Sequence, residues 1–284
     1  MSRAPVVGSS PHSASLKNEP LRCVEILGGN VLRTETFLLG GLEVLLVARP
    51  AGARGGGDIY CIHSCGHGAL AKFVLLDLTG HGQERDVIAQ TVHELLHRYE
   101  DETRPARLLD LLNQQYNHLA LRGIYATAVS ATYDPRRSEF SFANAGQPRP
   151  LHWSAQQRRW IAVRPAEESD CGLPLGVKEN ACCTEENIAF GPGDILFLSS
   201  DGLEETRSPT DAFLGPEGVL TLLEESTAET SQNSALVKQA AFFLWRAEEF
   251  RGSKEFEDDL TLLWLRRLPT NKSHGRPSTE RVAR

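Results

Sequence analysis

Hydrophobic residues along the chain fall into short blocks whose spacing changes between strand and helix periods. Strands are predicted where apolar residues run together or alternate between turn-forming residues. Helices are predicted where apolar residues recur every three to four positions, as Val87, Ile88, Val92, Leu95 and Leu96 do. The predicted strands are 42–48, 58–63, 71–78, 124–133, 139–144, 150–153, 182–190, 195–199 and 260–266, and the predicted helices are 84–99, 106–121, 216–225 and 234–249.

The order of these elements indicates the fold class. Strands surround two pairs of helices instead of alternating with helices one for one. This order predicts a mainly antiparallel α+β layered domain and argues against a doubly wound parallel sheet. Residues 21–40 are expected to form either an additional strand pair or a contact for a partner, and the sequence leaves both open.

The two ends of the chain differ in composition from its centre. Residues 1–20 and 269–284 are rich in Ser, Pro and other polar residues, which is typical of disordered segments. Between them there is neither a Pro- and Gly-rich linker nor an internal repeat. One domain over residues 21–268, with a disordered arm before it and a disordered tail after it, is therefore the expected organisation.

The overall composition narrows the function classes. Of the 284 residues, 40% are hydrophobic and 24% are charged, and the net charge of −7 argues against a nucleic-acid binder. No apolar run is long enough to span a bilayer, and residues 1–20 lack the apolar middle of a signal peptide, so a cytoplasmic protein without membrane contact is expected. Six cysteines do not form a dense disulfide framework, and reduced thiols are expected for Cys23, Cys61, Cys65, Cys171, Cys182 and Cys183.

Several aspartates share one kind of position, the boundary between an apolar strand and a polar or glycine-rich turn. Asp58 follows three glycines, Asp77 and Asp201 end apolar strands, and Asp258 and Asp259 open the last predicted strand. Aspartate at a strand end is also ordinary turn chemistry. If several such ends met at one edge of a sheet, their burial would need a positive partner, and a divalent cation with oxygen ligands is the natural one.

Six segments in a fixed order carry a family resemblance: GGGD, DLTGHG, NAGQPRP, LPLG, GPGD followed by SSDG, and EDDLTLL. Over roughly residues 42–266 the chain resembles the metal-dependent protein phosphatase (protein phosphatase 2C) family. It is most similar to the bacterial SpoIIE-type branch, which includes regulators of sigma-factor pathways. The resemblance implies a four-layer α-β-β-α sandwich, in which two mainly antiparallel sheets are flanked by helical pairs.

The same resemblance implies an activity and a ligand set. The activity is hydrolysis of phosphoserine or phosphothreonine on a regulatory protein, such as an anti-sigma-factor antagonist, with two Mn²⁺ or Mg²⁺ ions. Asp77 would bridge the two metals, and Asp58 and the backbone carbonyl of Leu78 would serve one of them. Asp201 and Asp258 would serve the other. Two such cations activate water for attack on phosphorus.

Further residues have more than one interpretation. Asp259 would neighbour the metal site, and the resemblance leaves open whether Asp258 or Asp259 is the direct ligand. His81 would protonate the leaving oxygen or be a plain turn residue. Arg54 would grip the substrate phosphate or be a solvated loop residue.

The chain also departs from the family pattern at two positions. Cys61 replaces an acidic residue that usually lies three positions after the GGD aspartate, and Gln147 replaces the histidine of AGH. Neither change removes a ligand of the metal pair. The change at Cys61 argues against a third metal or an auxiliary ligand.

A zinc metalloprotease is the main alternative. The segment His93-Glu94-Leu95-Leu96-His97 matches H-E-x-x-H on a predicted helix, where two histidines bind zinc and the glutamate acts as a base. The charged Arg98 and the lack of a well-placed third ligand argue against it. The plainer interpretation places both histidines on the exposed side of an amphipathic helix.

Other chemistries find less support in the sequence. The cluster Cys61, His63, Cys65 and His67 could bind a soft metal, but its one-residue spacing also fits a simple hairpin. No cysteine is followed by arginine six residues later, and no P-loop is present, which argues against a thiol phosphatase and a nucleotide-binding P-loop. A catalytically inactive phosphatase fold that serves as a binding module remains a further alternative.

Overall fold

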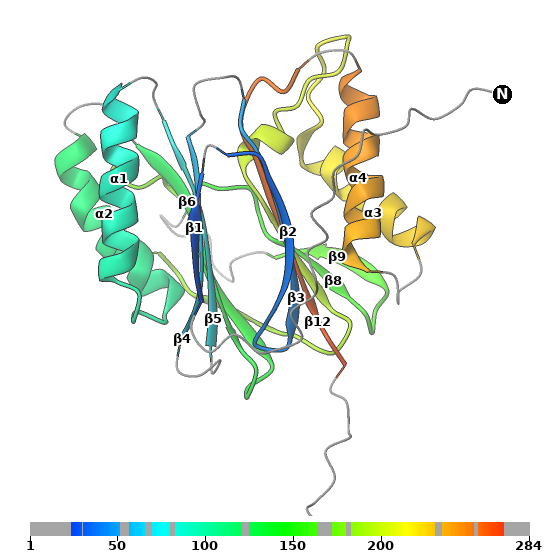
Figure 1. Cartoon of the computed structure of the whole chain (residues 1–284), viewed down its shortest axis with the longest axis horizontal. Coiled ribbons are helices and arrows are strands. Elements are labelled where there is room, and N and C mark those ends of the chain that lie inside the picture. The colour runs from blue at the N-terminus through cyan, green and yellow to red at the C-terminus, as the bar shows by residue number, and fades with distance from the viewer. Residues whose placement is uncertain are drawn as a thin grey trace, which may run out of the picture.

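Two six-stranded antiparallel sheets pack face to face in the computed structural model, and one pair of helices covers each outer face (Figure 1). This confirms the predicted α+β class and its four layers. The residues that the structure describes are 24–29, 31–51, 57–65, 70–79, 83–120, 125–163, 172–179, 183–230, 235–252 and 255–269.

The elements are distributed between the layers as follows. The first sheet has the order β1 (Val24–Gly28), β4 (Asp58–Cys65), β5 (Leu70–Leu78), β6 (Ala126–Asp134), β7 (Glu139–Ala145) and β10 (Glu186–Ala189). The second has the order β2 (Arg33–Leu39), β3 (Leu42–Arg49), β12 (Leu260–Arg267), β11 (Ile195–Ser199), β8 (Leu151–Ser154) and β9 (Arg159–Ala162). The helices are α1 (Gln83–Arg98), α2 (Pro105–Ala120), α3 (Gly215–Glu229) and α4 (Leu236–Arg251), with a 3₁₀ turn η1 at Asp201–Leu203.

The apolar residues form three layers, and strand alternation assigns each residue to one of them. On β5, Phe73 and Leu75 pack between the two sheets, whereas Val74 and Leu76 pack under α1 and α2. A third layer fills the space between the second sheet and α3 and α4. Because both faces of the central strands are buried, their sequences read as continuous apolar runs such as FVLLDL.

Most predicted elements are present, with three differences. Residues 21–40 do supply two strands, but β1 pairs with β4 and β2 pairs with β3, so the two lie in different sheets and do not form a pair. The strand β9 was not predicted; its four residues form an edge strand of the second sheet in which one side chain, that of Trp160, is buried. The predicted strand 182–190 is reduced to β10, since only four residues pair with β7.

The predicted arm, residues 1–20, and the predicted tail beyond residue 269 lie outside the described residues, so the predicted domain boundaries stay predictions. Among the described residues, none of the helices combines the length and the apolar composition that a membrane span requires.

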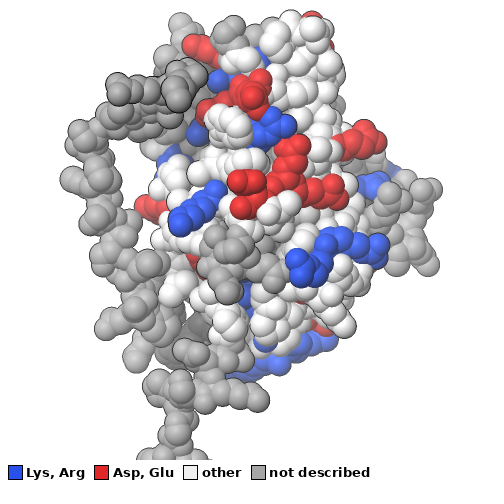
Figure 2. Space-filling view, turned by 90° about the vertical axis from the view of Figure 1, so that its right-hand side faces the viewer, with Lys and Arg blue, Asp and Glu red and all other residues white. Residues whose placement is uncertain are grey.

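The face formed by α3 and α4 has mixed charge (Figure 2). Acidic side chains gather near its centre, and Lys and Arg lie around them in separate groups. Arg246 of α4 illustrates this mixing, because it pairs with Glu225 of α3 and with Glu249 of its own helix. The visible side of this face therefore has no continuous basic surface; the expectation that the protein does not bind nucleic acid stays a prediction.

The GPGD segment before β11 has a structural role that the sequence did not indicate. Asp194 accepts hydrogen bonds from the backbone N–H of Gly191 and of Ala155, both at 2.8 Å. Its Oδ2 also lies 3.1 Å from Nε2 of His152. This carboxylate therefore closes its own turn and ties it to the end of β8.

Replacing Asp194 with asparagine is expected to lower the free energy of unfolding by about 1–3 kcal/mol near neutral pH. Burial raises the pKa of Asp194, but the contacts from His152, Ala155 and Gly191 outweigh burial, so the pKa lies below its usual 3.8. A lowered pKa contributes stability above the unfolded-state pKa, and this stability is lost as the pH falls through the folded-state pKa. Urea unfolding at several pH values should show the difference between the proteins shrinking below about pH 4. A difference that grew in acid would contradict this account.

Candidate active site

The acidic residues of the first sheet lie side by side at one end of the sandwich. Asp58 is the first residue of β4 and pairs directly with Asp77 near the end of β5. Tyr60 and Phe73 lie between the two sheets, and side chains two or four positions apart on a strand share a face. Asp58 and Asp77 therefore both point into the space between the sheets.

The second sheet brings its own acidic residues to the same end through the pairing of β11 with β12. Ser200, just after β11, donates its N–H to the carbonyl of Thr261 at 2.9 Å and accepts the N–H of Thr261 on Oγ at 3.0 Å. Beyond this junction, Asp201 begins η1, and Asp258 lies just before β12. A Cβ placed on Gly202 would lie 2.1 Å from the carbonyl oxygen of Asp259, so only glycine fits there.

Asp259 links the two sheets. It is 3% exposed, and its Oδ1 accepts the N–H of Ala51 at 2.7 Å while its Oδ2 accepts the N–H of Asp58 at 3.3 Å. Both carboxylate oxygens therefore bind backbone on either side of the glycine-rich segment 52–57. The adjacent Asp258 is exposed, and its Oδ1 accepts the N–H of Asp259 at 2.7 Å.

Gly57 lies where the carboxylate of Asp77 and the carbonyl of Leu78 come together. The carbonyl oxygen of Gly57 accepts the N–H of Leu78 at 3.2 Å. A Cβ on Gly57 would lie 2.5 Å from Oδ1 of Asp77 and 2.7 Å from the carbonyl oxygen of Leu78. The absent side chain leaves these two oxygens open to the same small space.

The pKa values of these carboxyl groups show how close the charges are to one another. Burial, followed by the charges of Asp201, Asp258 and Asp259, raises the pKa of Asp77 to about 7. Burial and the charge of Asp77 raise the pKa of Asp58 well above its usual value, against hydrogen bonds from Thr261 and Ser200.

The carboxyl groups on the second sheet are shifted in the same direction. Burial, then the charges of Asp258 and Glu205, raises the pKa of Asp201. Burial and the charge of Asp201 do the same for Glu204. The two sheets thus form one acidic site, in which burial and neighbouring carboxylates raise the pKa of each of these four groups.

The carboxylate and carbonyl oxygens at this site are suitable ligands for a hard divalent cation. Oδ2 of Asp58 is buried and has no hydrogen-bond partner within the described residues. The open space beside Gly57 presents one carboxylate oxygen and one carbonyl oxygen, both of the type that Mg²⁺, Mn²⁺ or Ca²⁺ prefers. Within the described ranges, however, no three His, Cys, Asp or Glu side chains are close enough to hold an ion by themselves. A bound cation would therefore also need carbonyl or water ligands.

Comparison of the sequence with known protein families identifies the family of the chain. Residues 68–268 match the model described as Stage II sporulation protein E (SpoIIE). The chain belongs to the SpoIIE family. The resemblance inferred from the sequence segments is thereby confirmed.

The individual relatives of this SpoIIE-family chain share a quarter or less of its residues over the matched region. The phosphoserine phosphatase RsbU of Bacillus subtilis is 25% identical over 163 residues, which cover 57% of this chain and 45% of RsbU. The chain thus spans less than half of that relative's length. The RsbU and RsbW domains of Rv1364c from Mycobacterium tuberculosis superpose with a TM-score of 0.65 at 21% identity, covering 80% of this chain and 60% of that one. The catalytic domain of the serine/threonine phosphatase PstP, solved with two manganese ions, gives 0.55 at 14% identity, covering 80% and 99%.

Three of the SpoIIE-family segments extend the site along the first sheet. Asp77 pairs with Thr127 on β6, whose Oγ1 accepts a hydrogen bond from Nε2 of Gln147 at 2.9 Å. Leu175, from LPLG, exchanges two backbone hydrogen bonds with Ala126. Asp77 from DLTGHG, Gln147 from NAGQPRP and Leu175 from LPLG therefore meet around the start of β6.

Two predicted site residues lie outside the described residues. These are His81 and Arg54, and their roles stay predictions. Cys61 is described, and it is buried under α1 and α2 on the face of β4 opposite to Asp58, because residues three apart point to opposite faces. Cys61 therefore does not take the place of the acidic residue as a ligand at this site.

The other metal-binding alternatives gain no support. His97 is exposed and lies 3.2 Å from Glu100, as expected for an amphipathic helix. His93 differs from that expectation: it is half-buried, burial lowers its pKa, and its Nε2 has no partner within the described residues. In the cluster of cysteines and histidines, His67 and the side chain of Cys65 lie outside the described part. Cys61 and Cys183, the cysteines whose side chains are described, are not in disulfides.

Sequence reasoning missed the residues that hold the site together rather than those that carry charge. Gly57, Thr127, Ser200 and Thr261 make the contacts described above, and Glu204 adds a further, half-buried carboxyl group. Only Gly57 and Ser200 had a sequence signal, because they stand next to the aspartates in GGGD and SSDG.

Proposed function

We propose that this chain is a metal-dependent serine/threonine protein phosphatase that uses two divalent cations, Mn²⁺ or Mg²⁺. The observation that supports this most directly is the meeting of Asp58, Asp77, Asp201 and Asp258 at one end of two packed sheets. The family membership and the phosphatases with the same fold support it further. With water ligands completing each site, Asp58, Asp77 and the carbonyl of Leu78 would hold one cation, and Asp77, Asp201 and Asp258 would hold the other.

When bound, the cations would lower the pKa of a water molecule and neutralise charge on the phosphoryl group. The chain's own part is positioning. Asp259 fixes both ends of segment 52–57 by binding the N–H groups of Ala51 and Asp58. Gly57 keeps the oxygens of Asp77 and Leu78 free of side-chain contact. His81 is proposed to protonate the leaving oxygen and Arg54 to grip the phosphate.

The substrate is proposed to be a phosphorylated regulatory protein. RsbU is a phosphoserine phosphatase by name, and one structural relative joins an RsbU domain to an RsbW domain. An anti-sigma-factor antagonist carrying phosphoserine is therefore the proposed partner. The proposed place of action is the cytoplasm.

Hydrolysis of p-nitrophenyl phosphate tests the activity itself. The protein should release p-nitrophenol when Mn²⁺ is added and stop when a chelator is added. Hydrolysis that needs zinc, cleaves peptide bonds and is lost in Glu94→Gln would instead support the metalloprotease. Absence of both activities, with Mn²⁺ binding to the protein, would support the inactive binding module.

A further inference from the structure

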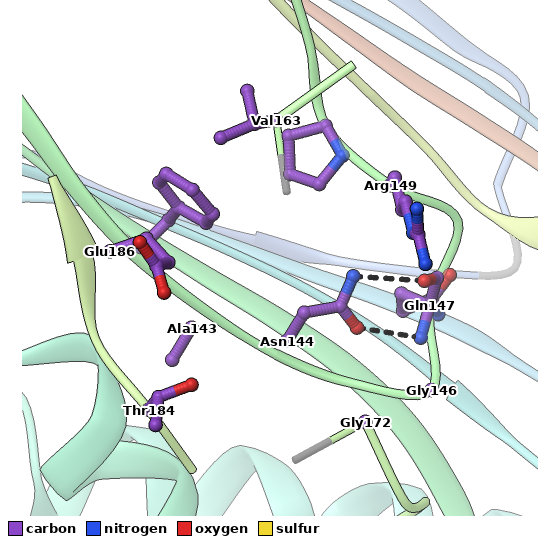
Figure 3. A pocket seen from close by; sticks show the side chains of 11 residues that line it. Ala143, Asn144, Gly146, Gln147, Arg149, Val163, Gly172, Thr184 and Glu186 are labelled. Carbon is purple, nitrogen blue, oxygen red and sulfur yellow. Dashed lines mark hydrogen bonds between the residues drawn. The ribbon is translucent and has the colours of Figure 1, made fainter. Parts of the chain in front are cut away.

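A pocket of about 380 Å³ lies beside the acidic site, at the edge of the first sheet. Residues of β7, of the loop that follows it, and of the approach to β10 line it (Figure 3). Its size falls within the range of ordinary ligand pockets. Its lining is mixed, with apolar Phe142 and Val163 and polar Asn144, Gln147 and Arg149.

Hydrogen bonds connect this pocket to the acidic site. Asn144 donates to the carbonyl of Gln147 at 2.9 Å and accepts the N–H of Gln147 at 2.9 Å, which fixes the loop that carries Arg149 (Figure 3). The side chain of Gln147 then reaches Thr127, the direct strand partner of Asp77. Asp77 and the pocket are therefore about two strand spacings apart, roughly 10 Å.

The charges of the pocket are arranged on opposite sides. Figure 3 shows Arg149 beside Gln147, and Glu186 and Thr184 across from them. Arg149 is exposed and has no ion pair within the described residues. Gln147 is 5% exposed, and its Oε1 has no hydrogen-bond partner within the same ranges. The side of the pocket nearest the loop therefore offers a guanidinium that is open to a ligand.

We propose that this pocket is a specificity subsite, which receives an acidic side chain of the phosphoprotein substrate near its phosphoserine. The inference rests on the proposed phosphatase function. Arginine binds a carboxylate through two parallel hydrogen bonds, and Arg149 is the exposed cationic side chain in the lining of this pocket. An extended peptide advances about 3.3 Å per residue, so the preferred acid lies two to four residues from the phosphoserine.

A peptide series tests this subsite. Each peptide carries one phosphoserine in a neutral sequence and a single Glu or Lys at one of the four positions on either side. We expect one position, two to four residues from the phosphoserine, at which Glu gives a kcat/KM about 5- to 10-fold higher than Lys. Arg149→Glu should reverse the preference at that position alone. Arg158→Glu makes the same charge change at an exposed position outside this pocket and should leave the preference intact.

Binding of the same peptides, with a non-hydrolysable phosphonate in place of phosphoserine, separates the two claims. Fluorescence anisotropy reports the Glu preference and its reversal in Arg149→Glu without requiring turnover. A preference in binding without hydrolysis would overturn the proposed function and support the subsite. Hydrolysis with no position-specific preference, or a preference that Arg149→Glu leaves unchanged, would overturn the subsite.

Discussion

Asp77→Asn is expected to lower Mn²⁺-dependent hydrolysis of p-nitrophenyl phosphate by about 10³-fold or more. The charges of Asp201, Asp258 and Asp259, which flank β11 and β12 of the second sheet, all raise the pKa of Asp77, and this places Asp77 between the two halves of the site. Asparagine keeps its shape but removes the charge that would hold two cations together. The measurement is kcat/KM at saturating Mn²⁺ for the native protein and the variant.

The same substitution is expected to stabilise the metal-free protein. The pKa of Asp77 is raised from 3.8 to about 7 by burial and by neighbouring carboxylates. A raised carboxyl pKa gives stability that is fully present below the unfolded-state value and is lost as the pH rises through the folded-state value. In chelator at about pH 8, the free energy of unfolding of Asp77→Asn should therefore exceed that of the native protein by about 2–4 kcal/mol. At about pH 4 the two values should differ little.

Thermal unfolding in chelator at both pH values measures this gain. Asp101→Asn is the matched control. Asp101 is exposed in the turn after α1, and its charge is not one of those that raise the pKa of Asp58, Asp77 or Asp201. The control should alter neither activity nor the pH profile of stability. An active Asp77→Asn variant, or one that is less stable than the native protein at high pH, would show that this carboxylate is not at the centre of a cation site.

The fold could be predicted from the sequence because each layer leaves a periodic signal. Apolar runs such as 71–78 identify central strands buried on both faces, and the spacing in 84–99 identifies a helix that covers one of them. The short edge strand β9 left no such signal. The assignment of β1 and β2 to different sheets depends on contacts with β4 and β3, and the sequence of 21–40 does not contain those contacts.

The sequence predicts those residues of the candidate site whose role follows from their own side chain, such as the aspartates. It does not predict the residues whose role depends on their contacts in the folded protein. Asp58 and Asp77 stand beside glycines at strand ends, which is a local pattern. That they are direct strand partners depends on the register of β4 and β5. Gln147 was noticed only as a departure from AGH, yet it connects the acidic site to the pocket through Thr127. Such links join residues that are 20 positions apart and cannot be recovered from spacing alone.

The contacts of Asp258 and Asp259 distinguish their proposed roles: Asp258 is the metal ligand, and Asp259 is a positioning residue. Asp259→Asn is expected to lower the free energy of unfolding by about 1–3 kcal/mol, because an amide nitrogen cannot accept the N–H of Ala51 or Asp58 and one contact is lost. Segment 52–57 would lose one attachment, and the affinity for Mn²⁺ should fall about 10- to 100-fold.

Asp258→Asn makes the same chemical change one residue earlier and should have the opposite profile. Asp258 is exposed, so its substitution should change stability by only about 0.5 kcal/mol. The charge of Asp258 raises the pKa of Asp201 and of Asp77, which indicates that it lies close to both. Because Asp258 is proposed to hold a cation with them, its substitution should lower the activity about 10²-fold or more even at saturating Mn²⁺. Urea unfolding of the metal-free variants and Mn²⁺ titration of their activity provide both readouts. A stable but inactive Asp259→Asn variant, together with an active Asp258→Asn variant, would reverse the assignment. Asp259 would then be the metal ligand, although both of its carboxylate oxygens bind backbone N–H groups.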